Sequence, residues 1–167
     1  MERPSHDPTQ RRPHGLGDAW VDGPDGRFWG TFGAAGLLLA HPEAGVLLQH
    51  RAIWSHHGGT WGVPGGARKP GETAEAAAIR ESDEEAGVPP ELIRVLGNSV
   101  FDVGYWSYTT VLAVATDFFE PYLGDAESIA LSWVPIADVA GLPLHPGLAS
   151  GWPALRQRLA EFDPRLA

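Results

Sequence analysis

Short apolar stretches alternate along the chain with clusters of glycine, proline and charged residues, which is typical of strands joined by turns. The longest stretch predicts a strand over Phe28–Ala40, in which Gly33 and Gly36 would permit a bulge or close packing. Further strands are expected over Val46–Ala52, Leu92–Asp102, Ser107–Thr116 and Ile129–Val134. The segment Trp54–Gly66 is rich in glycine and flat rings, so we expect it to be an exposed loop.

Two stretches have the spacing of helices. Thr73 is a favourable N-cap and Gly87 a favourable residue after the last turn, so a helix is expected from Thr73 to about Ala86. Near the end of the chain, apolar residues recur at steps of three and four, which predicts an amphipathic helix over Pro153–Phe162 with its proline in the first turn. The order of these elements predicts an α/β domain with a mixed sheet and helices packed on it.

The composition fits one folded domain of ordinary size. The chain has 167 residues, of which 43% are hydrophobic and 20% are charged, as in soluble globular proteins. Residues 1–17 contain no apolar core, so we expect them to form a flexible arm, and residues 18–167 to form the domain. The same residues lack the apolar centre of a signal peptide, and a cytoplasmic protein is expected.

The charge balance narrows the classes of partner. Twelve basic residues against 21 acidic ones give a net charge of −9, which argues against binding to a nucleic acid polymer or to an anionic membrane. A small phosphorylated ligand stays compatible with this charge, because a metal ion can invert the local sign. The chain contains no cysteine, so a disulfide framework, a thiolate nucleophile and a cysteine-based zinc site are excluded.

Three carboxylates share one face of the first predicted helix. Glu81, Glu84 and Glu85 lie at positions i, i+3 and i+4, so their side chains point the same way. Like charges at these spacings repel one another unless something neutralises them. A hard divalent cation such as Mg²⁺ would do so, because it prefers carboxylate oxygens. The alternative from spacing alone is a solvated acidic face on which Arg80 pairs with Glu84.

The surrounding residues resemble the Nudix hydrolase family. The family pattern G-x5-E-x7-R-E-U-x-E-E-x-G-U is matched at its fixed positions by Gly66, Glu72, Arg80, Glu81, Glu84, Glu85 and Gly87, with Val88 as the last apolar residue. Ser82 departs from the pattern, which usually has an apolar residue there. Trp61–Gly66 and Trp133–Pro135 also resemble family segments. The resemblance implies a Nudix-type α/β/α sandwich with a mixed central β-sheet.

The resemblance also implies a chemistry, namely hydrolysis of the diphosphate linkage in a nucleotide with Mg²⁺ or Mn²⁺ as cofactor. The implied metal ligands are three helix glutamates and one backbone carbonyl: Glu81, Glu84, Glu85 and Gly66. Arg80 resembles the arginine that orients the catalytic glutamate, with Glu72 as its partner. The general base stays open between Glu81, Glu85 and a later acidic residue, for which Glu120, Asp125 and Glu127 are the candidates. Glu127 is nearest in sequence to the Trp133 strand, and we include it among the expected ligands.

The residues that would recognise the substrate are less sharply indicated. Arg51 follows a predicted strand and could pair with a phosphate. Trp54, His56 and His57 could stack on a base, and Tyr105 could line the other wall of a base pocket. The alternatives are a surface arginine, packing rings and aromatic residues that cap the sheet.

Within the family, the most favoured activity is that of a nucleoside triphosphate pyrophosphohydrolase of the 8-oxo-dGTP type. Hydrolysis of ADP-ribose or of diadenosine polyphosphates is the alternative. A nucleotide sensor without catalysis is disfavoured, because every charged position of the pattern is present. The lack of cysteine argues against the isomerase relatives that act on isopentenyl diphosphate. The oligomeric state, including a homodimer, stays open.

Overall fold

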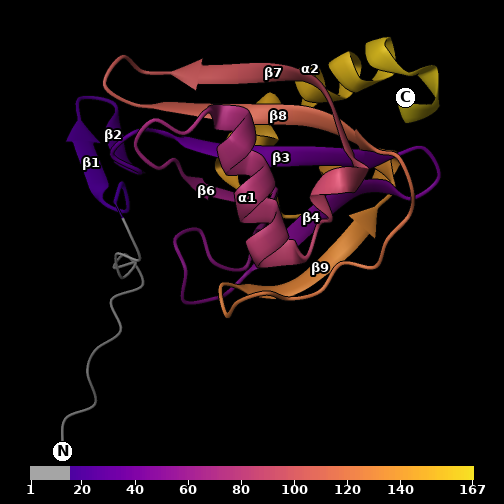
Figure 1. Ribbon diagram of the computed structural model, residues 1–167, viewed down its shortest axis with the longest axis horizontal. Coiled ribbons are helices and arrows are strands. Elements are labelled where there is room, and N and C mark those ends of the chain that lie inside the picture. Colours follow the sequence, from indigo (N-terminus) through magenta and orange to yellow (C-terminus); the bar gives the residue numbers. More distant parts are fainter. Residues whose placement is uncertain (1–15) are drawn as a thin grey trace, which may run out of the picture.

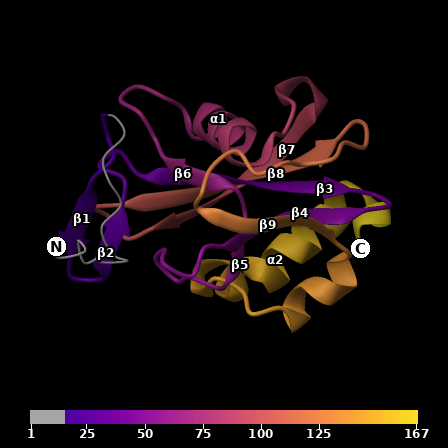
Figure 2. The ribbon, with the colours of Figure 1, turned by 90° about the horizontal axis from the view of Figure 1, so that it is seen from below.

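The fold is built on a mixed β-sheet with a long helix on each face (Figures 1 and 2). The computed structural model describes residues 16–167. Within this range the main sheet consists of β3 (Ala34–His41), β4 (Gly45–Arg51), β5 (Trp61–Gly62), β6 (Gly65–Ala67), β7 (Ile93–Asp102), β8 (Ser107–Ala115) and β9 (Ser128–Val134). The helices are α1 (Ala74–Ala86) and α2 (Pro146–Phe162), and the short 3₁₀ turns are η1 (Pro90–Leu92), η2 (Ile136–Gly141) and η3 (Pro164–Leu166). β1 (Trp20–Gly23) and β2 (Gly26–Trp29) form a separate hairpin.

The strand order of the main sheet is β5-β4-β3-β8-β7, and β6 also pairs with β3 while β9 pairs with β4. β3 and β8 run parallel, and the other pairs are antiparallel. The sheet is therefore mixed, as expected. None of the helices in residues 16–167 is long and apolar enough to cross a membrane.

Alternating side chains of β3 separate the two halves of the core. Leu37 and Leu39 pack under α1, while Leu38 and Ala40 pack over α2, because successive strand residues point to opposite faces. α1 contributes Ala77, Ala78 and Ala86, and α2 contributes Leu148, Trp152, Leu155 and Leu159. Burial of each such leucine is worth about 1.5–3 kcal/mol. The helix–sheet–helix arrangement confirms the predicted α/β/α sandwich.

The first predicted helix is confirmed at both ends. The Thr73 hydroxyl oxygen accepts a hydrogen bond from the backbone N–H of Ala76 at 3.1 Å. Gly87 has φ 63°, the left-handed conformation that commonly ends a helix. Ser82, the departure from the family pattern, is fully buried, and its hydroxyl donates to the Ile79 carbonyl at 3.0 Å. The polar group is thus satisfied inside the core.

The single strand predicted over Phe28–Ala40 is wrong, because the chain forms β2, a tight turn and β3 instead. Gly30 and Gly33 have φ values of 115° and 83°, which residues with a side chain rarely adopt. The backbone N–H of Gly33 donates to the Gly30 carbonyl at 3.1 Å and closes the turn. Gly33, which was expected to permit a bulge or close packing within one strand, therefore forms part of the turn that separates β2 from β3.

Two other boundaries also differ from expectation. α2 begins at Pro146 and not at Pro153, because the His145 imidazole Nδ1 accepts from the Gly147 N–H at 3.1 Å and caps the helix. Pro153 therefore lies inside the helix, where burial of Leu148 and Trp152 on one face offsets the hydrogen bond that proline cannot donate. The expected loop over residues 54–66 also contains β5 and the start of β6, which pair with β4 and β3.

Candidate active site

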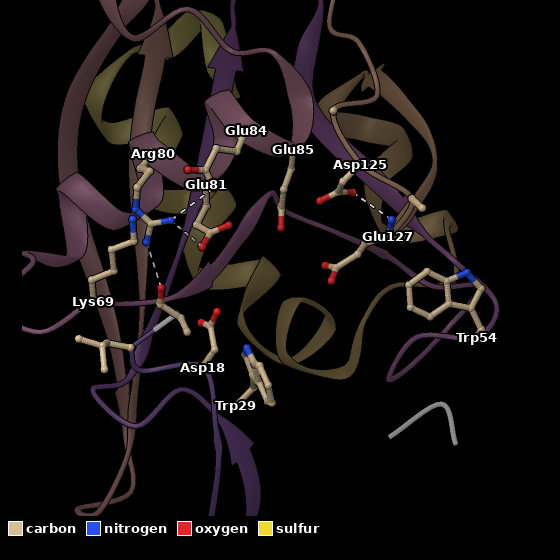
Figure 3. Close-up of a pocket in the computed structure, with 14 residues that line it drawn as sticks. Asp18, Trp29, Trp54, Lys69, Arg80, Glu81, Glu84, Glu85, Asp125 and Glu127 are labelled. Carbon is tan, nitrogen blue, oxygen red and sulfur yellow. Dashed lines mark hydrogen bonds and ion pairs between the residues drawn. The ribbon is translucent and has the colours of Figure 1, made fainter. Parts of the chain in front are cut away.

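One pocket of about 540 Å³ lies where α1 faces the loop before β9 and the segment around the β1–β2 hairpin (Figure 3). Its lining residues are Leu16, Asp18, Trp29, Trp54, Ala67, Lys69, Arg80, Glu81, Glu84, Glu85, Gly124, Asp125, Ala126 and Glu127. Carboxylates outnumber cations among them. The pocket thus brings the three helix glutamates together with acidic residues that lie some forty positions later in the chain.

The three helix glutamates differ in their exposure. Glu85 is only 4% exposed, and its Oε2 accepts a hydrogen bond from the backbone N–H of Gly65 at 3.1 Å. The side chain of Glu84 is 57% exposed at the pocket rim, and that of Glu81 is 16% exposed. The three carboxylates project from one face of α1 but differ in how deeply they are buried in the pocket.

Arg80 connects the helix carboxylates to the segment before the helix. Its Nε and Nη2 donate to the two carboxylate oxygens of Glu72, both at 2.8 Å, and Nη2 also donates to the Ala67 carbonyl at 3.1 Å. This confirms the predicted pairing with Glu72. Nη1 lies 3.0 Å from Glu81 and 3.4 Å from Glu84, so the alternative contact with Glu84 is present but longer. The hydrogen bond from Arg80 lowers the pKa of Glu72, and the same bond raises the pKa of Arg80.

The loop before β9 supplies two further carboxylates. Asp125 and Glu127 each place a carboxylate oxygen so that these atoms and one of Glu85 lie within 4.8 Å of one another. The Asp125 carboxylate accepts from the Glu127 N–H at 2.9 Å, and the Glu127 carbonyl accepts from the Ala52 N–H at 2.8 Å, which fixes the loop. Of the three later acidic residues proposed from the sequence, Asp125 and Glu127 line the pocket, whereas Glu120 does not.

Gly66 lies directly against the Glu81 carboxyl group. A Cβ atom at this position would come within 2.7 Å of Glu81 Cδ and Oε1, closer than real contacts of this kind. Gly66 pairs with Ala35 in the ladder between β6 and β3, so its backbone cannot move aside freely. The glycine of the family pattern is therefore required here for close approach of backbone and carboxylate.

The donor set fits a hard divalent cation. The oxygens of Glu85, Asp125 and Glu127 converge, and the pocket also exposes Glu81 and Glu84. Mg²⁺ and Mn²⁺ prefer carboxylate and carbonyl oxygens, and their charge would relieve the repulsion within such a group. The residues that could hold a metal ion thus come from both α1 and the loop before β9.

Trp54 is the one of the five predicted substrate-binding residues that lines this pocket, and its side chain is half exposed. Arg51 directs Nε and Nη2 to the His56 carbonyl oxygen at 3.0 and 2.9 Å, which ties the loop that carries Trp54 to the end of β4. The His56 ring packs edge-on against Trp20, and the His57 ring lies 4.8 Å from that of His145. Arg51, His56 and His57 are therefore not among the residues that line the pocket, and their contacts support the loop that carries Trp54.

Tyr105 lies against the β1–β2 hairpin and outside the pocket lining. Its hydroxyl donates to the Gly26 carbonyl at 2.9 Å and accepts from the Asp25 N–H at 3.2 Å. In the same contact, Phe28 stacks on Trp106 with ring centroids 4.3 Å apart. The aromatic residues of the β7–β8 turn thus hold the hairpin in place.

Half of the lining residues were not indicated by the sequence. They are the small residues Ala67, Gly124 and Ala126, and the larger side chains Leu16, Asp18, Trp29 and Lys69. Leu16 belongs to the predicted arm 1–17, of which residues 1–15 lie outside the described part of the chain. Gly17, also in the predicted arm, accepts hydrogen bonds at its carbonyl from Ala19 and Thr31. Only the fold brings these residues to the helix carboxylates.

Comparison with known proteins identifies the family. The family profile described as "NUDIX domain" matches residues 31–157, which is well over half of the chain. The chain therefore belongs to the Nudix family, and it is an enzyme of that family, a Nudix hydrolase.

Particular relatives are similar over most of their length. The chain is 49% identical over 153 residues to a Mycobacterium tuberculosis protein named "Putative 8-oxo-dGTP diphosphatase 3", covering 85% of this chain and 70% of that protein. The crystal structure of the M. smegmatis Nudix hydrolase RenU is 48% identical with a TM-score of 0.80, and the match covers 87% of this chain and 96% of that one. A C. elegans Ap4A hydrolase is 26% identical with a TM-score of 0.64, over 77% of this chain and 98% of that one.

Proposed function

We propose that this chain hydrolyses a nucleoside triphosphate of the 8-oxo-dGTP type to a nucleoside monophosphate and pyrophosphate, with Mg²⁺ or Mn²⁺ as cofactor. The observation that carries the proposal is the meeting of Glu85 with Asp125 and Glu127 inside a pocket that α1 lines. The name of the M. tuberculosis relative refers to the same class of substrate, which supports this choice.

The proposed ion site combines the two acidic segments. Glu85, Asp125 and Glu127 would hold the cation, with Glu81, Glu84 and the Gly66 carbonyl as the further ligands that the family pattern implies. When bound, such a cation withdraws charge from the diphosphate and lowers the pKa of a coordinated water.

Other groups of the pocket orient the carboxylates and supply positive charge. Arg80 holds the Glu81 carboxylate at 3.0 Å, and Glu72 in turn holds Arg80 through two bonds, so Glu81 keeps one orientation. The Gly65 N–H fixes Glu85 in the same way. Lys69 lines the pocket and offers a positive charge to the phosphates.

The proton of the attacking water would pass to Glu81 or to Glu127. Glu81 is anchored by Arg80, whereas Glu127 belongs to the converging carboxylate group. Glu81→Gln and Glu127→Gln would separate the two, because loss of the general base removes the acidic limb of the pH–rate profile. The variant that keeps this limb contains the intact base.

The test is hydrolysis of a nucleotide panel with products resolved by chromatography. The panel contains 8-oxo-dGTP, the four normal deoxynucleoside triphosphates, ADP-ribose and diadenosine tetraphosphate, each with Mg²⁺, with Mn²⁺ and with EDTA. We expect nucleoside monophosphate and pyrophosphate from 8-oxo-dGTP, and no turnover in EDTA. Release of AMP and ribose phosphate would instead assign the chain to ADP-ribose hydrolysis.

Hydrolysis of diadenosine polyphosphates is the second candidate function. The C. elegans relative is named for this activity, and its match covers nearly all of that protein. Preferential release of ATP and AMP from diadenosine tetraphosphate would support it. Lack of turnover with every compound and both metals would favour a nucleotide sensor. Light scattering of the same sample would show whether the chain is a homodimer.

A further inference from the structure

The loop between β8 and β9, residues 116–127, is docked on the last turn of α1. This helix ends at Ala86, and the last carbonyl groups of a helix have no partner within it. The Tyr122 N–H donates to the Ala86 carbonyl at 3.1 Å, and the Gly124 N–H donates to the Glu85 carbonyl at 3.0 Å. The middle of the loop thus supplies backbone donors to carbonyl groups at the end of the helix.

Two glycines allow this close approach of loop and helix. A Cβ atom on Gly124 would collide with the Glu84 carbonyl oxygen, so the loop backbone lies directly against the helix backbone. Gly87, the left-handed residue that ends the helix, lies under the ring of Tyr122, and a Cβ atom there would collide with that ring. The missing side chains therefore let the two segments interlock.

The docked residue is next to the carboxylates of the loop. Asp125 follows Gly124 directly, and Glu127 comes two positions later. The Glu85 carbonyl accepts from the Gly124 N–H, so the main chain of Glu85 is tied to the loop. Its carboxylate converges with those of Asp125 and Glu127 (Figure 3). Because one residue step separates the docked N–H from Asp125, the place of Gly124 constrains the distance between the helix and loop carboxylates.

Two other hydrogen bonds hold the loop away from the helix. The Phe119 carbonyl accepts from the Trp133 indole N–H at 3.1 Å, and the Glu127 carbonyl accepts from the Ala52 N–H at 2.8 Å. These bonds tie the two ends of the loop to β9 and to the chain after β4. The docked segment 122–124 ties its middle to α1, and this is the contact that relates the loop to the helix carboxylates.

We propose that Gly124 is a positioning residue for a divalent cation, because its docking on α1 sets the separation between the Glu85 carboxylate and the carboxylates of the loop. It supplies neither a ligand nor a proton in this role, and it acts through Asp125 and Glu127. The proposal rests on the proposed metal-dependent hydrolysis and names the contact that brings the two acidic segments into register.

The first test compares Gly124→Ala with Gly141→Ala. Gly141 is exposed at the end of η2, and a Cβ atom there would meet no atom within 4 Å, so the same substitution is harmless at this position. Binding of Mn²⁺ is followed by electron paramagnetic resonance without substrate. We expect Gly124→Ala to weaken Mn²⁺ binding about 10- to 100-fold, the range for residues that orient metal ligands. Gly141→Ala should bind Mn²⁺ as the wild type does.

Hydrogen exchange of the metal-free protein in EDTA measures the docking itself. Peptides from residues 116–127 should exchange faster in Gly124→Ala than in the wild type, because the loop can no longer lie against the helix. Peptides from residues 74–86 should keep their protection, which shows that α1 is intact. If α1 also loses protection, the insertion variants decide the question.

Two insertions of a single glycine separate the docking from the mere flexibility of the loop. An insertion between Gly124 and Asp125 keeps the docked N–H but shifts the carboxylates that follow. An insertion between Glu120 and Pro121 lengthens the loop equally, before the docked segment. Longer loops cost little stability, so both variants should fold. We expect the first insertion to weaken Mn²⁺ binding as Gly124→Ala does, and the second to bind Mn²⁺ as the wild type does.

The outcomes distinguish the positioning role from the proposed function. Unchanged Mn²⁺ binding in Gly124→Ala with an intact α1, or equal Mn²⁺ binding by the two insertion variants, would overturn the positioning role, while the proposed hydrolysis would stand. A wild-type chain that binds Mn²⁺ with the expected dependence on Gly124 but hydrolyses no nucleotide of the panel would overturn the hydrolysis alone.

Discussion

The two ends of the pocket are built in different ways. The acidic end depends on α1, where one helical turn aims Glu81, Glu84 and Glu85 in one direction and Arg80 is held by Glu72 from the preceding segment. Away from α1, Asp18 and Trp29 line the pocket beside the docked hairpin, whereas Trp54, in the loop after β4, lies next to Glu127 (Figure 3). The helix carboxylates are therefore encoded in local spacing, whereas the loop carboxylates and the opposite wall reach the pocket through tertiary contacts.

The forces that hold the two ends differ as well. At the acidic end, a partly buried guanidinium and backbone N–H groups fix the carboxylates through charge-assisted hydrogen bonds. At the other end, stacked rings and neutral hydrogen bonds fix the hairpin. Changes at the acidic end should affect turnover most, and changes in the contacts of the hairpin should affect stability.

The largest effect is expected from Glu85→Gln. The variant keeps the size of the side chain and an oxygen that can accept from the Gly65 N–H, but it removes a buried charge from the converging carboxylates. We expect kcat to fall about 10²- to 10⁴-fold with little change in thermal stability. Asp83→Asn is the matched control, because Asp83 is exposed on the same helix. Wild-type turnover in Glu85→Gln would contradict the assignment of the acidic end.

Arg80→Lys should have the next largest effect. Lysine cannot form the double contact with Glu72, so Glu81 loses its orientation, and we expect kcat to fall about 10- to 100-fold, as for other residues that position metal ligands. The free energy of unfolding should fall by about 1–3 kcal/mol in urea denaturation. Arg94→Lys on the exposed edge of β7 is the control. Equal loss in both variants would show that the guanidinium geometry is unimportant.

The pair of Arg80 and Glu72 also predicts a dependence on pH. Because Arg80 lowers the pKa of Glu72 in the folded state, the pair stabilises fully above the ordinary value of 4.5 and loses this contribution as the pH falls through the lowered pKa. Arg80→Lys should therefore show a shallower loss of stability below pH 4.5 than the wild type.

A smaller effect is expected from His145, which lies behind the loop that carries Trp54. Burial, then Arg51, then His57 and His56 lower the pKa of His145 to about 4 from an ordinary 6.5. Between these values the unfolded chain binds a proton that the folded chain excludes, so stability falls as the pH falls from 6.5 to 4. His145→Asn keeps an acceptor for the N-cap and cannot titrate. Between pH 6.5 and pH 4, the free energy of unfolding should fall by about 1–2 kcal/mol less in His145→Asn than in the wild type. Identical curves of stability against pH in the two proteins would contradict the account.

The smallest effect is expected from Tyr105→Phe. The variant removes two hydrogen bonds to the hairpin, at Gly26 and Asp25, and should lower the free energy of unfolding by about 0.5–1.5 kcal/mol with kcat unchanged. A tenfold rise in KM without loss of stability would instead support the direct substrate contact that the sequence suggested.

The sequence predicted the helix part of the acidic end because its information is local, whereas it left the later carboxylate open between Glu120, Asp125 and Glu127. Thr73 and Gly87 mark the helix ends, and the spacing of the glutamates requires only the helical repeat. The α/β/α fold also followed from the order of strands and helices together with the family pattern. The predicted strand across Gly30 and Gly33 was wrong, because their positive φ values depend on the turn that seats β3.

The wall of the pocket opposite α1 could not be predicted in the same way. Asp18 and Trp29 carry no pattern of their own. Trp29 is placed by the pairing of β1 with β2, and Asp18 by the hydrogen bonds of Gly17 and Ala19 to Thr31 and Gly30. Arg51 and His56 are residue types that often contact substrates, but here the Arg51 side chain donates to the His56 carbonyl oxygen and supports the loop. Residue type alone does not distinguish a side chain that meets the substrate from one that supports it.

The most direct test of the central claim is a titration with Mn²⁺ followed by electron paramagnetic resonance. The account places carboxylates of α1 and of the loop before β9 around the same ion. It therefore predicts that Glu85→Gln and the Asp125→Asn, Glu127→Gln double variant each weaken the binding of one class of Mn²⁺, while Asp83→Asn binds as the wild type does. Unchanged Mn²⁺ binding in Glu85→Gln would contradict the account.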